Sequence, residues 1–401
     1  MRDDQPPDPG GKGPTTPGPD GAAPGGSPWT GASALGARRG RRRRRGLRAT
    51  AWTAAAVVLL GAGGAGYVYY RLNDNIRSVD INGALGRNRP APLGNGAMDI
   101  LVLGSDSRSG VNAEYGRSSG ARSDTAMIVH LNKGHRAATV VSIPRDTLVG
   151  RPECAKPHGG AVPPEQDVMF NSAYEVGGPA CAVKTVEHMS GLRMDHYIEV
   201  DFTGFKHLID ALNGVPLTTT QAIHDTKSHL TLAAGTHTLD GEQALGLVRT
   251  RHGVADGSDL GRIQLQQAFM KALMDRVGGL GVLTSPTKLF SVADIATSAV
   301  TTDTGLGSVN KLMGLAQSVQ HLEAGHVRMV TLPVRYSATN PNRVLPIDSR
   351  AAMVWAALRA DKPVPAAATK GTAGDELKAG KVVKGPVAPS PSTRSPRPKH
   401  R

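Results

Sequence analysis

The chain has 401 residues and a formal net charge of +14, but this charge is unevenly distributed. Residues 1–48 and 361–401 each carry a net charge of +6, and the region between them carries only +2. Proteins that bind nucleic acid place their basic surface on the folded element that docks, so this distribution argues against nucleic-acid binding.

The N-terminal part of the chain predicts a disordered cytoplasmic tail followed by a membrane span. Residues 1–48 are rich in Pro, Gly and Asp and end in a run of arginines. The next 22 residues, Ala49–Tyr70, carry no charge and are long enough to cross a bilayer as a helix. Because arginines before a span remain in the cytoplasm, the rest of the chain is expected outside the cell. A cleaved signal peptide is the alternative, but its charged region would be far shorter than this tail.

Residues 71–95 are predicted to be a linker, and residues 96–360 an α/β domain. Strands are expected at Ile100–Gly104, Ala126–Leu131, Ala138–Ile143 and Tyr197–Phe202. Helices are expected at Gly178–Ser190, Thr203–Leu212, Gly241–Val248 and Leu260–Val277, the last with Asp259 as a candidate N-cap. Residues 361–401 are rich in Pro, Lys and Ala and are predicted to be a disordered basic tail.

The two cysteines and the thirteen histidines do not have the spacing of a metal site. Cys154 and Cys181 form an even pair in the part of the chain predicted to be outside the cell, which favours a disulfide over free thiols. The stretch that contains His224, His229 and His237 is expected to be a polar surface loop.

Two glycine motifs lack the context that their usual chemistry requires. The GxGxxG pattern at residues 61–66 lies inside the predicted span, where helix packing by small residues explains it better than dinucleotide binding. The GxSxG pattern at residues 116–120 has polar flanks instead of a strand and a helix, which argues against a serine hydrolase.

Polar residues stand beside the predicted strands and predict a site for a metal and a phosphate. Asp106 follows the first strand, Asp124 precedes the second, and Arg145 and Asp146 follow the third. Paired aspartates hold hard divalent cations, so Asp106 and Asp124 are expected to bind Mg²⁺.

Arginines and a glutamine late in the domain complete this predicted site. Arg262 and Gln266 are four residues apart and lie on one face of the predicted helix. Arg249 and Arg251 share a side only if that stretch is extended. Arginine binds phosphate oxygens bidentately, so these four residues are expected to form an anion pocket for a diphosphate.

The motifs and their order resemble those of the LytR-CpsA-Psr family of cell-wall ligases. The resemblance runs from about Met98 to Phe269 and rests on these segments: LGSDSR (103–108), RSDT (122–125), SIPRD (142–146), NSAY (171–174), VKTVEHMSGL (183–192), HYIEVDFTGF (196–205), LDGEQALGLVRTRH (239–252) and DLGRIQLQQ (259–267). One departure is Met169, since members of this family often have a lysine just before the segment that matches NSAY.

The resemblance implies a three-layer α/β/α domain with a central mixed sheet, which buries a polyprenyl chain in an apolar pocket. It implies that Asp106 and Asp124 hold Mg²⁺ and that the diphosphate is bound by Arg122, Arg249, Arg251, Arg262 and Gln266, with Arg145 near it. Asp106, Asp124, Arg122, Arg249 and Arg251 form the catalytic set on this reading.

The expected activity is transfer of a glycopolymer from a polyprenyl-diphosphate carrier onto peptidoglycan at the outer face of the membrane. Two alternatives remain at this point. One is a pyrophosphatase that uses water as the acceptor at the same site. The other is a membrane-anchored regulator that binds glycan or lipid without catalysis.

Overall fold

The computed structural model describes residues 57–106, 122–156, 159–251, 258–279, 286–376 and 383–384, without the side chains of residues 106, 122–124, 286–289, 376 and 384. A helix runs through residues 57–75. Among the described residues, no helix is both long enough and apolar enough to cross a membrane. Because the predicted span Ala49–Tyr70 lies partly outside the described residues, it stays a prediction.

A mixed sheet lies at the centre of the fold. Within the described residues it has seven strands, which lie in the order β1 (Arg77–Val79), β14 (Val300–Asp303), β9 (His196–Asp201), β2 (Met98–Asp106), β3 (Arg122–Leu131), β4 (Ala138–Ile143) and β15 (Val327–Thr331). β2 is parallel to β9 and antiparallel to β3, which in turn is antiparallel to β4. The predicted α/β class and mixed sheet are confirmed, and the first three predicted strands fall in β2, β3 and β4.

The fourth predicted strand extends one residue too far. β9 ends at Asp201, whose side chain accepts a hydrogen bond from the Gly204 N–H at 2.8 Å and caps the next helix. Phe202 is therefore the first residue of α4 (Phe202–Ala211) and not the last residue of the strand. An aspartate cap outweighs the β propensity of one phenylalanine here.

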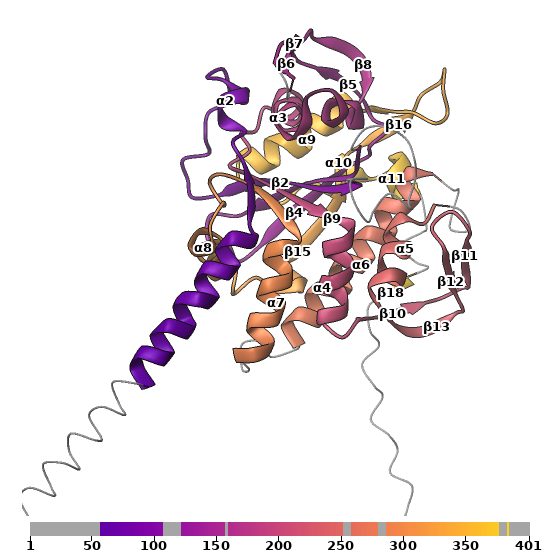
Figure 1. The fold of residues 1–401 in the computed structure, drawn as a ribbon. Coiled ribbons are helices and arrows are strands. Elements are labelled where there is room, and N and C mark those ends of the chain that lie inside the picture. Colours follow the sequence, from indigo (N-terminus) through magenta and orange to yellow (C-terminus); the bar gives the residue numbers. More distant parts are fainter. Residues whose placement is uncertain are drawn as a thin grey trace, which may run out of the picture. The chain divides into compact units, whose positions relative to one another are not determined.

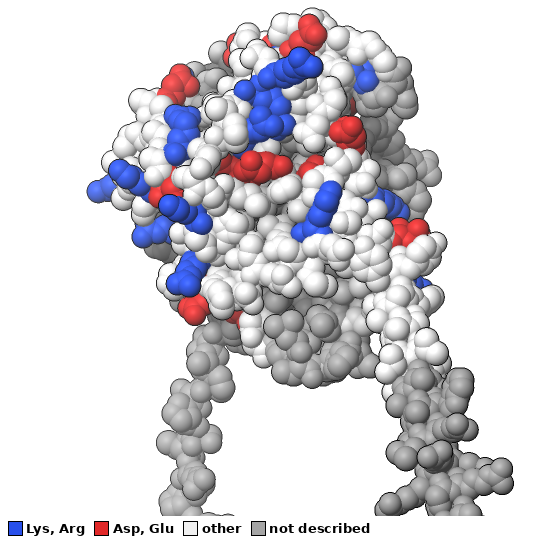
Figure 2. Space-filling model, turned by 90° about the vertical axis from the view of Figure 1, so that its left-hand side faces the viewer, with Lys and Arg blue, Asp and Glu red and all other residues white. Residues whose placement is uncertain are grey.

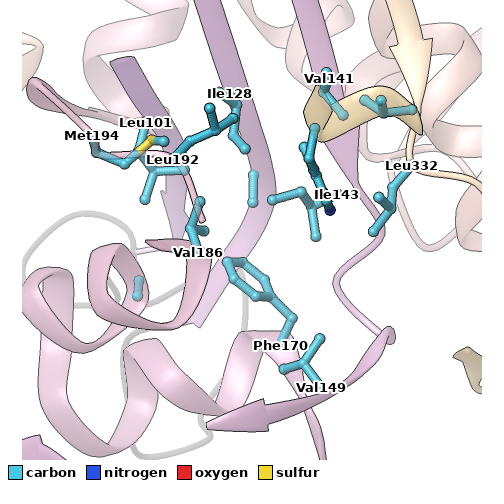
Figure 3. Packing of buried hydrophobic residues seen from close by; sticks show 14 of the residues in the cluster. Leu101, Ile128, Val141, Ile143, Val149, Phe170, Val186, Leu192, Met194 and Leu332 are labelled. Carbon is cyan, nitrogen blue, oxygen red and sulfur yellow. The ribbon is translucent and has the colours of Figure 1, made fainter. Parts of the chain in front are cut away.

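One face of the sheet is covered by α3 (Phe170–Ser190) and α9 (Asp348–Arg359) (Figure 1). Leu101, Ile128 and Val141 from the sheet pack with Phe170 and Val186 from α3 in the main core (Figure 3). All five are 0–1% exposed, and burial of each such side chain stabilises the fold by roughly 1.5–3 kcal/mol.

The opposite face carries α4, α5 (Gly241–Arg249), α6 (Asp259–Gly279), α7 (Pro286–Ser298) and α8 (Val309–Ser318), which completes a three-layer arrangement (Figure 1). A second core joins α4, α5 and α6 to β10 (Val215–Thr219) and β13 (Gly235–Leu239). Between the sheet and α8, apolar side chains such as Val102, Val129 and Ile198 are only partly buried. This face therefore offers partly exposed apolar surface directly on the sheet.

The helix predicted at Gly178–Ser190 begins earlier, at Phe170. Gly178 has a left-handed φ of 63° followed by Pro179, and the helix is interrupted there. The Gly-Pro pair marks this interruption, and the NSAY segment forms the first turn before it.

A disulfide joins Cys154 and Cys181, as predicted. It connects α3 to β6 (Cys154–Ala155), which pairs with β7 (Ala161–Val162). Next to it, β5 (Leu148–Arg151) pairs with β8 (Glu165–Met169).

Replacing both cysteines by serine is expected to lower the free energy of unfolding by roughly 3 kcal/mol, because the crosslink closes a long loop in the unfolded chain. Chemical denaturation of the full chain in detergent would measure the change. Reduction of the wild-type protein should give the same shift, and an unchanged midpoint in both cases would contradict this role.

Three segments differ from their predictions because long-range packing recruits them. The expected polar loop with His224 and His229 contains the hairpin of β11 (Ile223–Asp225) and β12 (Leu230–Leu232). The side chains of Ile223, Leu230 and Leu232 in this hairpin are buried. The predicted linker 71–95 contributes β1 and α2 (Asn82–Leu85). The predicted tail contains α10 (Ala366–Thr369), α11 (Ala373–Glu376) and β18 (Val383–Lys384), which pairs with β10.

The surface of the folded part has charges of both signs. On the face shown in Figure 2, basic and acidic side chains alternate and leave wide uncharged areas between them. This face therefore agrees with the low net charge of the central region and is not the continuous basic surface of a nucleic-acid-binding domain.

Candidate functional site

The predicted metal ligands come from one end of a strand pair. The last residue pair of β2 and β3 is Asp106 with Arg122, and Ser105 pairs with Ser123. A register shift beside Gly104 places Asp124 at a bulge between these pairs and Thr125. The backbone thus brings Asp106, Arg122 and Asp124 to the same end of the sheet, while their side chains lie outside the described part.

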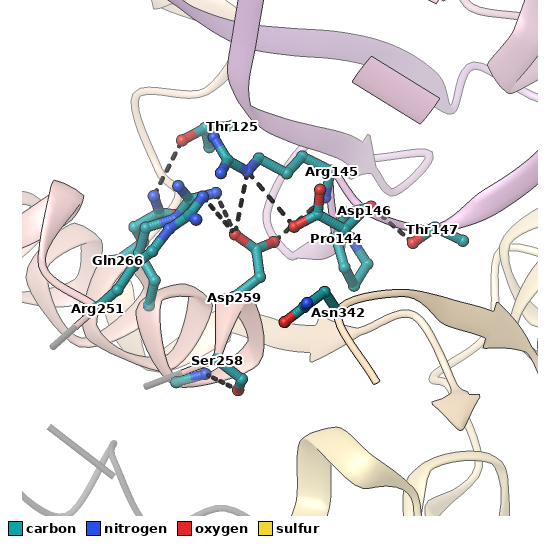
Figure 4. Close-up of polar contacts among 12 residues, drawn as sticks. Thr125, Pro144, Arg145, Asp146, Thr147, Arg251, Ser258, Asp259, Gln266 and Asn342 are labelled. Carbon is teal, nitrogen blue, oxygen red and sulfur yellow. Dashed lines mark hydrogen bonds and ion pairs between the residues drawn. The ribbon is translucent and has the colours of Figure 1, made fainter. Parts of the chain in front are cut away.

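Asp259, at the start of α6, gathers the arginines of the site (Figure 4). Among the described side chains, three guanidinium groups contact its Oδ1: Arg262 Nη2 at 2.5 Å, Arg251 Nη2 at 3.4 Å and Arg145 Nε at 3.6 Å. The backbone N–H of Arg145 also donates to Asp259 Oδ2 at 3.2 Å. One carboxylate, only 9% exposed, therefore fixes arginines from three separate segments.

The prediction of Asp259 as a helix N-cap is wrong. Asp259 is the first residue within α6, and the Ser258 hydroxyl before it accepts a hydrogen bond from the Gly261 N–H at 3.4 Å. Because Ser258 fills the capping position, the Asp259 carboxylate is left to bind arginines.

Arg262 and Gln266 lie on the same face of α6, as the helical spacing predicts. Both are buried, at 4% and 7% exposure. Gln266 Nε2 donates to the Thr125 hydroxyl at 3.0 Å and to the Val248 carbonyl at 2.8 Å. Gln266 therefore ties the start of β3, next to Asp124, to the end of α5, next to Arg249.

Arg249 and Arg251 have different surroundings. The guanidinium of Arg249 lies 5.2 Å from the centroid of the Phe202 ring, a cation–π contact at the start of α4. Arg251 follows the end of α5, and its backbone N–H donates to Asp225 Oδ2 at 2.9 Å. Of the two, only Arg251 has a described contact with Asp259.

A cavity of about 440 Å³ opens beside this cluster. Its walls include Arg145, Asp146, Arg251 and Asp259, together with Arg343 from the segment before β17 (Val344–Pro346). Among the described lining residues, Arg145 and Arg251 lie on the side of Asp259, and Arg343 lies next to Asp146. The arginines beside Asp259 are groups that can bind the oxygens of an anionic ligand.

Burial and the nearby charge of Asp259 raise the pKa of Asp146, and the positive charges of Arg145 and Arg343 only partly oppose this shift. Ionised Asp146 is thus less stable in the folded protein than in water. Perturbed carboxyl groups of this kind are frequent where ligands bind.

Asp146→Asn is expected to increase the free energy of unfolding at neutral pH. A carboxyl with a raised pKa in the folded protein ionises less readily there than in the unfolded chain. It therefore destabilises the fold as the pH rises above its pKa in the unfolded chain, which is about 4. The gain from the substitution should therefore disappear below that pH. Thermal unfolding of the wild type and the variant, at pH values above and below about 4, would measure this gain in stability. An equal difference at every pH would refute the raised pKa of Asp146.

The structure places Arg145, Arg251 and Arg262 around Asp259 and keeps Gln266 on the same helix face, whereas Arg249 lies against Phe202. Two acidic residues take part that the sequence did not assign to the site. Asp259 holds the arginines, and Asp225 fixes the backbone of Arg251. Both are acidic partners, and a search for phosphate-binding residue types alone passes over them.

Comparisons with known proteins agree with these motifs. The LytR_cpsA_psr family model matches residues 68–360. The chain is 33% identical over 308 residues to the cell wall biosynthesis protein LcpA of Corynebacterium glutamicum, covering 70% of this chain and 58% of LcpA. It is 36% identical over 233 residues to TagT of Bacillus subtilis, a polyisoprenyl-teichoic acid–peptidoglycan teichoic acid transferase, covering 55% of this chain and 67% of TagT.

A solved structure has the same fold. The LytR-Csp2A-Psr enzyme from Actinomyces oris superposes with a TM-score of 0.53 at 22% identity, covering 77% of this chain and 98% of that one. The central sheet with helices on both faces is therefore an architecture that this chain shares with that structure.

Proposed function

This chain belongs to the LytR-CpsA-Psr family, and we propose that it is a phosphotransferase that moves a glycopolymer from a polyprenyl-diphosphate carrier onto peptidoglycan. The observation that carries the proposal is the convergence of Arg145, Arg251 and Arg262 on Asp259 beside a polar cavity. The reaction named for TagT supports the same class of substrates.

The chemistry is an exchange of oxygens on phosphorus. An acceptor hydroxyl on peptidoglycan attacks the phosphorus that bears the glycan. The new O–P bond forms while the bond to the bridging oxygen breaks, polyprenyl phosphate leaves, and the hydroxyl proton is released to solvent. The arginines hold the non-bridging oxygens and stabilise the charge that grows on the leaving group. Because Asp259 fixes the arginines before the ligand binds, little reorganisation is needed during the reaction.

Asp106 and Asp124 are proposed to hold the Mg²⁺ of this site. Their positions fit a shared cation, because the pairing of β2 with β3 brings both to one strand end. Gln266 lies close to this end, since its Nε2 donates to the Thr125 hydroxyl. When bound, the ion would supply a positive charge that neutralises the diphosphate and its leaving group.

Removal of divalent cations is expected to lower transfer by at least about 100-fold, since a metal at a transferring phosphoryl group contributes several kcal/mol. Asp106→Asn and Asp124→Asn should lose the response to added Mg²⁺ at the same time. Transfer rates measured over a Mg²⁺ titration would show this, with Asp275→Asn, an exposed aspartate of α6, as the control. Full activity in chelator would rule out the metal.

The lipid part of the donor needs apolar surface near the membrane. The partly buried apolar side chains between the sheet and α8, among them Val102, Val129 and Ile198, are proposed to contact the polyprenyl chain.

We also propose that residues 49–70 anchor the chain in the membrane with the folded domain on the outer face, because the arginine run precedes that segment.

A labelled donor separates transfer from its alternatives. The full chain in detergent would receive a lipid-diphosphate donor with label in its glycan, together with peptidoglycan. Transfer predicts label in the insoluble polymer. A pyrophosphatase would instead release labelled glycan phosphate into solution whether or not peptidoglycan is present. A regulator without catalysis would leave the donor unchanged.

A further inference from the structure

The 440 Å³ cavity extends beyond the arginines that surround Asp259. Its far wall is formed by the end of the hairpin of β16 (Val334–Tyr336) and β17, which contributes Tyr336, Asn342 and Arg343. None of these three belongs to a motif that resembles the family. The volume lies within the range of small-ligand sites, roughly 300–1,000 Å³.

This far wall is held in place by backbone contacts. The Ser337 N–H donates to the Arg343 carbonyl at 2.9 Å, and the Arg343 N–H donates to the Asn340 carbonyl at 3.0 Å. The Val344 N–H donates to the Asp146 carbonyl at 3.3 Å, so the hairpin is tied to the turn that carries Arg145 and Asp146. The two walls of the cavity are therefore fixed relative to each other.

Asp146 stands between the two walls. Its carboxylate lies 3.6 Å from Arg145 Nε and 3.8 Å from Arg343 Nη1, both beyond hydrogen-bond distance. The side chain is 19% exposed, and in Figure 4 the Asn342 side chain lies near Asp146 and Asp259. Carboxylate oxygens, an amide and a guanidinium thus line a single space.

The mixture of groups favours a neutral polar ligand over a second anion or a lipid. Asp146 repels phosphate in this part of the cavity, and the polar walls are unsuited to a hydrocarbon chain. Carboxylates, amides and arginines bind hydroxyl and acetamido groups, while an aromatic ring packs on the C–H face of a sugar. Tyr336 is 40% exposed and provides such a ring.

We propose that this cavity is a saccharide subsite beside the diphosphate site, with Asp146, Asn342 and Arg343 as its polar contacts and Tyr336 as its aromatic contact. The inference rests on the proposed function, because it takes the arginines at Asp259 as the diphosphate site. The sugar that occupies it belongs either to the donor glycan or to the peptidoglycan acceptor, since both meet at the reacting phosphorus.

Steady-state kinetics on Asn342→Ala and Tyr336→Ala in the full chain tests the proposal. Each variant is expected to raise one KM by about tenfold, as the loss of one or two contacts would do, with a smaller change in kcat. A raised KM for peptidoglycan assigns the subsite to the acceptor, and a raised KM for the donor assigns it to the donor glycan. Tyr336→Phe should retain most of the aromatic contact. Arg335→Ala, an exposed neighbour in β16, is the matched control.

A binding measurement keeps this inference separate from the proposed function. Saturation-transfer NMR with a soluble peptidoglycan disaccharide, and separately with the free donor glycan, reports binding without any turnover. Binding of at least one probe to the wild type and its loss in Asn342→Ala supports the subsite, even if no transfer is seen. Unchanged KM values together with equal probe signals in wild type and variant would overturn it.

Discussion

Asp259→Ala is expected to lower the rate of transfer by about 100-fold or more, although Asp259 itself does not contact substrate in the proposed mechanism. The carboxylate holds Arg145, Arg251 and Arg262, so its loss lets three positive charges separate and misplaces each of them. Arg262 is only 4% exposed, so the loss of its carboxylate partner should also lower the stability of the fold.

Two further variants separate the positioning role from simple unfolding. Asp259→Asn keeps the shape of the side chain and one acceptor oxygen, so it should fold more stably than Asp259→Ala but still transfer slowly. Asp275→Ala removes an exposed aspartate from the same helix and should change neither property. Transfer rates and unfolding curves would be measured side by side. Wild-type activity in Asp259→Ala would show that the arginine cluster is not part of the active site.

Arg251→Ala is expected to reduce kcat by about 100–1,000-fold, the usual loss when one preorganised group that stabilises developing charge is removed. Arg251 is 26% exposed and reaches the cavity, and its backbone is fixed by Asp225, so its guanidinium is both accessible and oriented. Arg251→Lys should recover little, because an ammonium group cannot form the same paired hydrogen bonds.

The matched control for Arg251 is Arg328→Ala, an exposed arginine of β15 in the central sheet. Single-turnover measurements with a lipid-diphosphate donor would separate binding from chemistry. An Arg251→Ala protein that transfers at the wild-type rate would contradict its assignment to the diphosphate.

The elements predicted best were those specified by local patterns. The run of apolar β-formers at 138–143 gave a strand with the predicted bounds, and the i, i+4 spacing placed Arg262 and Gln266 on one face of α6. The disulfide followed from the number of cysteines and the predicted compartment.

What the sequence did not reveal depends on contacts between distant segments. Asp259 looked like a helix cap because the neighbouring residues were considered alone, whereas its role comes from Arg145, 114 positions earlier. The wall with Tyr336 and Asn342 carries no motif and is recognised only when the hairpin packs against the Arg145 turn. Ala368 lies in a segment with the composition of a disordered tail, yet it is fully buried in the main core.

The arginines around Asp259 are proposed to hold the diphosphate of a lipid carrier. Mass spectrometry of lipids extracted from the full chain, after mild purification from membranes, would detect such a carrier. We predict a polyprenyl phosphate or diphosphate with the wild-type protein and with Asp275→Ala, and a strong reduction with Arg251→Ala and Asp259→Ala. Equal amounts of the lipid in all four preparations, or its absence from the wild type, would contradict the claim.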